Sequence, residues 1–571
     1  MMNEKKSLSR TERKPSTPVT RQGRSSGGWT APLWSLVDSL WAGSSDLERG
    51  NKLFEAGDYG GAIGFYNRAI DKKPGLKAAW LQRGIAQMSL QQYAEAIASF
   101  DGAVALKADD YWAWTLRGCC LYNLQQLQEA LASLDQAILI DPKHCEAWYQ
   151  RGRCLEDLEN YPEAVTAYGR ALKANPNVAS IWYHQAKALV QLGRYRPAVA
   201  AYDRHLEQAP DNFVAWYERG DVLQELQRYP EAVAAYEKVL VLAPDNAAAW
   251  LQRGVALAQM QRYTDAVASY DKALQLVPSH PGVWFYKGMA LKHQWSEAAI
   301  ACFDKAIELQ PNWPEAWLNR GLALCDASQY RAALAAFDKA TTLNPEWETA
   351  WLGRGLALHG LQRYKDAILA YSNALQIQPH YPEGWYHRGR ALDELGQNTE
   401  ALAAYDKAIS ILSESDLLTY QVWLQRSSVL EKMQQYPEAL ASYGKVIELK
   451  PDNIEAWLKR GELLMKMERY SEALAAYDEA IGIWPNHYEP WLRRAKVLGK
   501  MAAYSQSIAA CDRAIQIKPN LVPAWLLRGQ MLETLHRYSE AIGSYGIAIE
   551  MQPDNTEAIV NRQRLLNLLQ E

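Results

Sequence analysis

The sequence predicts an all-α protein in which helical hairpins stack into a solenoid, and three observations lead to this prediction. Tryptophan recurs at a nearly constant interval along most of the 571 residues. Within each interval, apolar residues fall at helical spacing in two blocks separated by a short polar turn. Nearly every interval also contains a closing proline, which favours the end of a helix.

The tryptophan interval defines the repeating unit. Eleven of the thirteen intervals measure 34 residues, one measures 33 and one measures 38. The tryptophans are Trp80, Trp114, Trp148, Trp182, Trp216, Trp250, Trp284, Trp317, Trp351, Trp385, Trp423, Trp457, Trp491 and Trp525. One hairpin cannot bury so large an aromatic face alone, so neighbouring hairpins must stack.

Small residues mark the places where the two helices of a unit approach. Gly stands four residues after the tryptophan and Ala sixteen after it, as Gly84 and Ala96 follow Trp80. An aromatic residue such as Phe100 stands twenty after it. We expect the small residues to allow close helix packing and the aromatic residues to fill the space between hairpins.

This pattern resembles the tetratricopeptide repeat, whose signature is Trp, Leu-Gly, an aromatic, Ala, a second aromatic, Ala and a closing Pro. The resemblance covers residues 43–571 and includes a first unit with Asp46 in place of tryptophan. It implies a right-handed α-solenoid superhelix. We expect repeats 1–11 at 43–419, repeats 12–15 at 420–555 after a four-residue insert, and a capping helix at 556–571. The units begin at residues 43, 77, 111, 145, 179, 213, 247, 281, 314, 348, 382, 420, 454, 488 and 522.

Charge and cysteine content limit the class of protein. The net charge is -4, and residues 1–28 carry most of the excess basic charge, so the repeats are acidic and bulk nucleic-acid binding is not expected. The cysteines are scattered and never spaced as CxxC, which is typical of reduced thiols. The sequence has no long apolar run and no signal peptide. We therefore expect a cytoplasmic protein. The form of the repeat, with an arginine three residues after the tryptophan, resembles that of long bacterial arrays.

The residues before the repeats form two segments. Residues 1–28 are rich in Ser, Thr, Arg, Lys and Pro, and we expect a disordered basic tail. Residues 29–42 include Trp34 and Trp41 at helical spacing with Leu33, Val37 and Leu40, which predicts a short amphipathic helix over 32–42. We expect it to cap the first hairpin. The alternative is that it lies on an anionic membrane surface, which would make the protein peripheral.

An arginine stands three residues after the tryptophan in most units, where the family usually has Leu. An acid often follows eighteen residues later, as Asp101 follows Arg83, so we expect a structural ladder of arginine–carboxylate pairs. The alternative is an anion-binding stripe for acidic partners or nucleic acid, since Arg suits bidentate contacts. The row comprises Arg83, Arg117, Arg151, Arg219, Arg253, Arg320, Arg354, Arg388, Arg426, Arg460, Arg494 and Arg528, and it is interrupted at Gln185 and Lys287.

The resemblance also implies where partners bind. In the family, the first helix of each hairpin lines a concave groove, and the residues one, five and eight after the tryptophan point into it. The candidate partner-binding residues are therefore Tyr149, Tyr183, Tyr217, Leu251, Val255, Phe285, Met289, Leu318, Leu322, Leu352, Leu356 and Tyr386. The alternative is that these side chains pack against neighbouring units. The Lys and Asn with which chaperone-binding members grip a terminal carboxylate are missing, so a chaperone co-factor is not expected.

No catalytic or metal-binding motif accompanies the repeats. The sequence lacks a phosphate-binding loop, a nucleophile elbow, a zinc-protease motif and a calcium loop, and acids such as Glu156, Asp157 and Glu431 fit a solvated groove wall. We expect no catalytic residue, cofactor, metal or small-molecule substrate. The predicted function is a scaffold or adaptor for peptide or helical segments of other proteins. The alternatives are a membrane-recruited assembly factor acting through 32–42 and a nucleic-acid binder acting through the arginine row.

Overall fold

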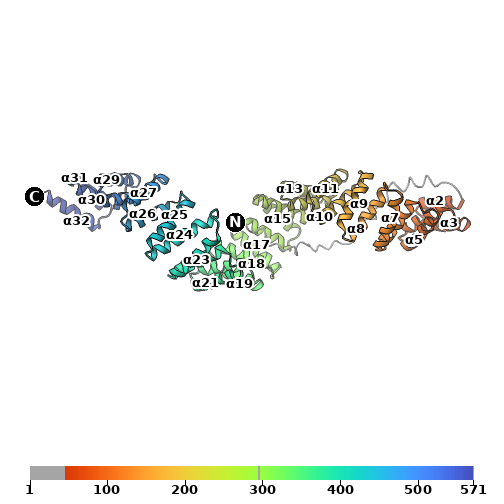
Figure 1. Ribbon diagram of the computed structural model, residues 1–571, viewed down its shortest axis with the longest axis horizontal. Helices are drawn as coiled ribbons and strands as arrows, with labels where there is room; N and C mark the ends of the chain where they lie inside the picture. The colour runs from red at the N-terminus through yellow and green to blue at the C-terminus, as the bar shows by residue number, and fades with distance from the viewer. Residues whose placement is uncertain (1–44, 293–295, 570–571) are drawn as a thin grey trace. The chain divides into compact units, whose positions relative to one another are not determined.

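The structure is a computed structural model that describes residues 45–292 and 296–569. These residues form 31 helices and no strand, which confirms the predicted all-α class. The helices follow one another as helix-turn-helix pairs (Figure 1). The expected basic tail at 1–28 and the amphipathic helix at 29–42 lie outside the described residues, so both stay predictions.

The chain divides into two compact units, Met1–Met260 and Gln261–Glu571. The helices of the first unit are α2 (Ser45–Glu55), α3 (Tyr59–Lys72), α4 (Lys77–Ser89), α5 (Tyr93–Leu106), α6 (Tyr111–Asn123), α7 (Leu127–Ile140), α8 (Cys145–Asp157), α9 (Tyr161–Ala174), α10 (Ala179–Gln191), α11 (Tyr195–Gln208), α12 (Phe213–Glu225), α13 (Tyr229–Leu242) and α14 (Ala247–Gln259). The boundary that the sequence suggested at 419/420 stays a prediction.

The second unit continues the same alternation. Its helices are α15 (Tyr263–Leu276), α16 (Pro281–Leu291), α17 (Ser296–Leu309), α18 (Pro314–Asp326), α19 (Tyr330–Leu343), α20 (Glu348–Gly360), α21 (Tyr364–Ile377), α22 (Pro382–Glu394), α23 (Asn398–Ile411), α24 (Leu417–Lys432), α25 (Tyr436–Leu449), α26 (Ile454–Lys466), α27 (Tyr470–Ile483), α28 (Tyr488–Lys500), α29 (Tyr504–Ile517), α30 (Val522–Thr534), α31 (Tyr538–Met551) and α32 (Thr556–Leu568). Helix α32 follows the last hairpin and buries Leu565 in the same cluster as Tyr545.

From α4 onward, nearly every first helix begins at the residue where a unit was expected to begin. The exception is α24, which begins at Leu417 and has 16 residues, where most first helices have 13. The four-residue insert therefore lengthens this helix, although we expected the unit to begin at 420. The turn before α24 is held by Asp416, whose carboxylate accepts a hydrogen bond from the backbone N–H of Ser413 at 2.9 Å.

A left-handed residue ends most first helices. In the turn after α4, Gln91 has φ 62°. Its N–H donates to the carbonyl of Met88, and the N–H of Gln92 donates to the carbonyl of Gln87. This is the Schellman arrangement, which satisfies carbonyls that the helix end would leave free. Most hairpins have a residue other than Gly at this place, although Gly adopts a positive φ most easily.

The tryptophans lie between successive hairpins, as the repeat pattern predicted. The indole Nε1–H of Trp317 donates to the carbonyl of Pro311, the closing proline before it, at 2.9 Å. Trp148 and Trp525 make the same bond to Pro142 and Pro519, each at 2.9 Å. Because each bond joins a first helix to the end of the preceding unit, it fixes the stacking of one hairpin on the next.

The first helices form one continuous face within each unit, which we call the inner face. Many successive first helices contact one another, as α6 contacts α8 in the first unit and α18 contacts α20 in the second. In the described part of the chain, successive second helices make no contact of similar extent. The first helices therefore approach one another more closely, and they lie on the inner side of the stack.

Candidate protein-binding face

The first unit carries five of the predicted partner-binding residues, all half-buried. They are Tyr149 on α8, Tyr183 on α10, Tyr217 on α12, and Leu251 and Val255 on α14. Each tyrosine packs against the aromatic ring of the second helix of its own hairpin. The ring centroids lie 6.2 Å apart for Tyr149–Tyr168, 6.2 Å for Tyr183–Tyr202 and 5.7 Å for Tyr217–Tyr236. The residue after the tryptophan thus contributes partly to the core.

The second unit carries the other seven predicted residues, on four consecutive first helices. Leu318, Leu352 and Tyr386 are buried, with exposed fractions of 7%, 8% and 9%. The half-buried residues are Phe285 and Met289 on α16, Leu322 on α18 and Leu356 on α20. On α18 and α20, the residue one after the tryptophan therefore lies deeper than the residue five after it. The assignment of the twelve residues to a binding site remains a prediction.

Polar contacts cross the inner face of the first unit. Glu156 on α8 accepts hydrogen bonds from the Tyr168 hydroxyl at 2.7 Å and from the Nδ1 of His184 on α10 at 3.0 Å. Burial alone would raise the pKa of the Glu156 carboxyl, but His184, Tyr168 and the charge of Lys187 outweigh it and lower the pKa. The carboxylate therefore links three helices and is not free for a partner.

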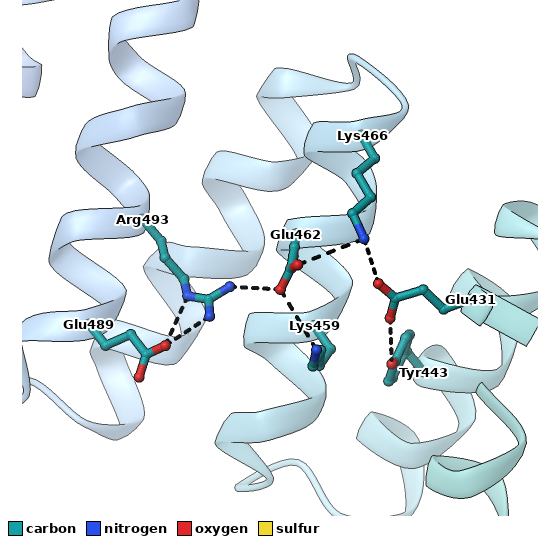
Figure 2. A network of polar contacts seen from close by, with 7 residues as sticks. All are labelled: Glu431, Tyr443, Lys459, Glu462, Lys466, Glu489 and Arg493. Atoms are coloured by element: carbon teal, nitrogen blue, oxygen red, sulfur yellow. Dashed lines mark hydrogen bonds and ion pairs between the residues drawn. The ribbon is translucent and has the colours of Figure 1, made fainter. Parts of the chain in front are cut away.

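A longer network follows the inner face of the second unit, as Figure 2 shows. Lys466 on α26 contacts Glu431 on α24 at 2.7 Å and Glu462 on its own helix at 3.8 Å. Glu462 also accepts a hydrogen bond from Arg493 on α28 at 3.0 Å, and Arg493 contacts Glu489 at 2.8 Å. Beyond it, Arg564 on α32 forms an ion pair with Glu533 on α30. These contacts link successive first helices.

Electrostatics keep the members of this network charged. Partial burial opposes ionisation of Glu462, but the hydrogen bond from Arg493 and the charge of Lys459 lower the pKa of its carboxyl. The hydrogen bond to Glu431 raises the pKa of Lys466. The sequence analysis did not identify this network. Its signal would have been opposite charges about one repeat apart, as at Glu431 and Lys466 or at Glu462 and Arg493.

The arginine row forms the expected ladder of ion pairs, but with different partners. Ten cations, counting Lys287, contact an acid on the second helix of the preceding hairpin, usually sixteen residues earlier, and not the acid eighteen residues later. The reason is that side chains on a helix lean toward its N-terminus. Arg83, Arg388 and Arg460 form no such pair, because Asn67, Ser372 and Gly444 stand at that place. The N–O distances lie between 2.5 and 2.9 Å for Arg117–Asp101, Arg151–Asp135, Arg219–Asp203, Arg253–Glu237, Lys287–Asp271, Arg320–Asp304, Arg354–Asp338, Arg426–Asp406, Arg494–Asp478 and Arg528–Asp512.

Most arginines of the row also lie over the ring of their own tryptophan, as Arg354 does at 5.6 Å from the Trp351 centroid. The carboxylate largely neutralises the charge of such a cation, and the ring covers one face of the guanidinium, so a phosphate would be attracted only weakly. These contacts disfavour nucleic-acid binding by the arginine row. They join each arginine to the preceding hairpin, as Arg354 is joined to Asp338.

Three further observations concern metal ligands, membrane spans and thiols in the described residues. Among residues 45–292 and 296–569, no group of three His, Cys, Asp or Glu side chains is placed to hold a metal ion. No helix in the same residues is long and apolar enough to cross a bilayer. The cysteines are free, and burial raises the pKa of the Cys120 and Cys511 thiols to about 12.

Comparison with protein-family models finds tetratricopeptide repeats along the chain. Models described as tetratricopeptide repeat match residues 53–118, 149–213, 217–281, 290–345, 321–382, 382–415 and 454–487, and one described as TPR repeat matches 429–468. A model of anaphase-promoting complex, cyclosome, subunit 3 matches residues 89–171. No curated protein matches the chain.

Several solved structures are similar to the chain. Naa15/Naa10 bound to HypK-THB shares 14% identity over 92% of this chain and 96% of that chain, with a TM-score of 0.33. The Cut9-Hcn1 hetero-tetramer of APC/C shares 16% over 85% and 95%, with a TM-score of 0.32. YrrB, described as a TPR protein with an unusual peptide-binding site, shares 25% over 32% and 95%, with a TM-score of 0.31.

Proposed function

We propose that this chain, which belongs to the tetratricopeptide repeat family, is a protein-interaction scaffold that binds peptide or helical segments of other proteins on its inner face. Repeats of this kind extend a surface one hairpin at a time, so affinity can be summed over several units. The proposed partners are proteins.

The observation that carries this proposal is an apolar row in the second unit. Met289, Leu322 and Leu356 stand five residues after the tryptophan on α16, α18 and α20, and all three are half-buried. Neighbouring packed helices lie about 8–10 Å apart, so the row spans roughly 20 Å, the reach of about six residues of extended peptide. Partly exposed apolar side chains in a row are typical of a peptide-binding surface.

The rest of the inner face supports the same location. On α24, α26 and α28, the charged side chains are committed to one another through Glu431, Lys466, Glu462 and Arg493. A ligand binding there would have to break ion pairs that already exist, which costs free energy. The apolar row requires no such exchange, because a bound side chain there displaces only water.

Site-specific photo-crosslinking tests the proposal. A photoreactive amino acid replaces Leu322 on the inner face or, as the control, Leu369 on α21, which is 64% exposed. We expect defined crosslinked proteins in extract of the native cell with the probe at 322 and not with the probe at 369. An excess of unlabelled protein should compete for them. Identical crosslinking patterns at the two positions would contradict the proposed face.

A further inference from the structure

Many second helices present a tyrosine hydroxyl toward the first helices, and the chain usually supplies an acceptor for it. The hydroxyls of Tyr168, Tyr443 and Tyr545 donate to Glu156, Glu431 and Glu533 at 2.7, 3.4 and 3.2 Å. Each of these glutamates stands eight residues after the tryptophan of the same hairpin. A carboxylate on the inner face can therefore reach a tyrosine hydroxyl that is buried behind it.

Two neighbouring hairpins lack this arrangement. Tyr371 on α21 and Tyr405 on α23 are fully buried, and neither hydroxyl has a hydrogen-bond partner. In the first of these hairpins, the place of the glutamate is taken by His359 on α20, whose Nε2 is also buried without a partner. In the second, Asp393 takes that place; it pairs with Lys432 at 2.6 Å and does not accept from the Tyr405 hydroxyl. Buried polar groups without partners are rare and costly.

A cation without a carboxylate lies among these groups. Arg390 on α22 is half-buried and lies over the Tyr386 ring, 5.8 Å from its centroid. It forms no ion pair with any carboxylate in the described part of the chain, and Glu394, one turn further along α22, is exposed. In most other parts of the array, cations of the first helices are paired with acids of the chain itself.

The imidazoles beside Arg390 do not add to its charge. Burial lowers the pKa of His387 on α22 to about 3, with the charges of Arg390 and His359 acting in the same direction. Burial, followed by the charge of Arg390, also lowers the pKa of His359. Both rings are neutral at pH 7, so the cluster presents one positive charge and two tyrosine hydroxyls without an acceptor.

We propose that this cluster, formed by His359, Tyr371, Arg390 and Tyr405, receives a carboxylate from a bound protein segment. The carboxylate pairs with Arg390 and takes the place that Glu156, Glu431 and Glu533 hold in other hairpins. It accepts the hydroxyl hydrogen bonds that the chain leaves open here. This inference rests on the proposed function and narrows it, because it specifies that the bound segment carries a carboxylate that reaches Arg390.

The surroundings favour a protein carboxylate over other anions. Leu356 stands on α20, which contacts α22, and Leu322 stands on α18, which contacts α20. A segment with an acidic residue near apolar residues therefore matches the face. The chain itself uses carboxylates to satisfy the same hydroxyl elsewhere. Charge-assisted hydrogen bonds of this kind are among the stronger polar contacts.

Selection from a displayed library of random short peptides tests the inference, with wild type, Arg390→Gln and Arg388→Gln as baits. Arg388 lies on the same helix, over the Trp385 ring, so it controls for loss of a guanidinium. We expect wild type and Arg388→Gln to select peptides with Asp or Glu beside apolar residues, and Arg390→Gln to lose the acidic preference.

The affinity of one selected peptide provides a second measurement. Replacing its Asp by Asn should weaken binding to wild type about tenfold or more, with much less effect on binding to Arg390→Gln. Amidated and phosphorylated peptides distinguish a chain terminus and a phosphate from a side-chain carboxylate.

A second variant places a carboxylate of the chain itself in the cluster. His359→Glu supplies the acid that other hairpins carry, so it should raise the melting temperature and reduce binding of the acidic peptide, while peptides without an acid bind as before. Two outcomes would overturn the carboxylate site while the scaffold function stands. One is that wild type selects apolar peptides without an acidic preference. The other is that Asp→Asn in the peptide weakens binding to wild type and to Arg390→Gln equally. If wild type selects no peptide at all and the crosslinks at 322 are also absent, the proposed function itself fails.

Discussion

The glycine four residues after the tryptophan shows how the absence of one side chain sets the distance between two helices. A Cβ built on Gly461 would lie 2.5 Å from the Cε1 of Tyr477, on the partner helix of the hairpin. No real Cβ tolerates such a contact, so even Ala would force the ring or the helix to move. The close approach is what buries the aromatic ring twenty residues after the tryptophan.

We expect Gly461→Ala to destabilise the protein by about 1–3 kcal/mol, because the added methyl group overpacks against the Tyr477 ring. Gly444→Ala in the neighbouring hairpin is the matched control. A Cβ there meets nothing within 4 Å, so this change should stabilise by about 0.5–1 kcal/mol through helix propensity. Urea unfolding of both variants measures the difference. Equal stabilisation by the two changes would show that the helices can separate freely.

At the scale of helices, the polar network of the second unit connects α24, α26 and α28, which are successive first helices. Figure 2 shows Glu462 between Arg493 and Lys466, so one carboxylate joins α26 to α28 and, through Lys466, to α24. Networks hold relative positions better than isolated pairs, because each member fixes its neighbours. The inner face is therefore ordered by polar contacts in one section and carries the apolar row in another.

A double-mutant cycle of Glu462→Gln and Arg493→Gln measures this connection. We expect a coupling of roughly 0.5–1.5 kcal/mol, reduced by salt, because both side chains are about one-third exposed. The pair Lys445–Glu448, at 2.5 Å on the exposed surface of α25, is the control and should show no measurable coupling. A coupling at Glu462–Arg493 no larger than that of the control would mean that the network does not stabilise the stack.

At the scale of the whole molecule, the helices of residues 45–292 and 296–569 make their extensive contacts with near neighbours along the chain. In such an array, stability is approximately a sum of the stabilities of the hairpins and of the interfaces between them. A local change therefore loosens its own neighbourhood, and hairpins at the ends open more easily than hairpins with two neighbours. Within each of the two compact units, this makes opening a local event.

Amide hydrogen exchange tests this view. We expect Gly461→Ala to accelerate exchange in α26 and α27 and in the hairpins next to them, while α4–α13 of the first unit exchange as in wild type. In the wild-type protein, α31 and α32 should exchange faster than α20–α23, which have neighbours on both sides. A uniform acceleration along the chain would show instead that the array unfolds as one cooperative body.

Much of the fold was predictable from the sequence because the information is local and repeated. The tryptophan interval, the closing prolines and the small residues predicted helix-turn-helix units. The starts of most first helices agree with those units, and α24 departs because an insert can be absorbed by lengthening a helix. The candidate groove residues were predicted from the same register, and the structure adds that Leu318, Leu352 and Tyr386 lie in the core.

What depends on contacts between hairpins was decided by the tertiary structure. The acid that pairs with Arg117 is Asp101 of the preceding hairpin, because the direction of a side chain matters as much as its spacing. Likewise, Tyr371 and Tyr443 occupy the same place in their repeats, but only one of them has an acceptor. The sequence by itself thus determined the repeating helices, whereas packing decided which polar groups are left open to a partner, because satisfying them requires side chains from different helices to meet.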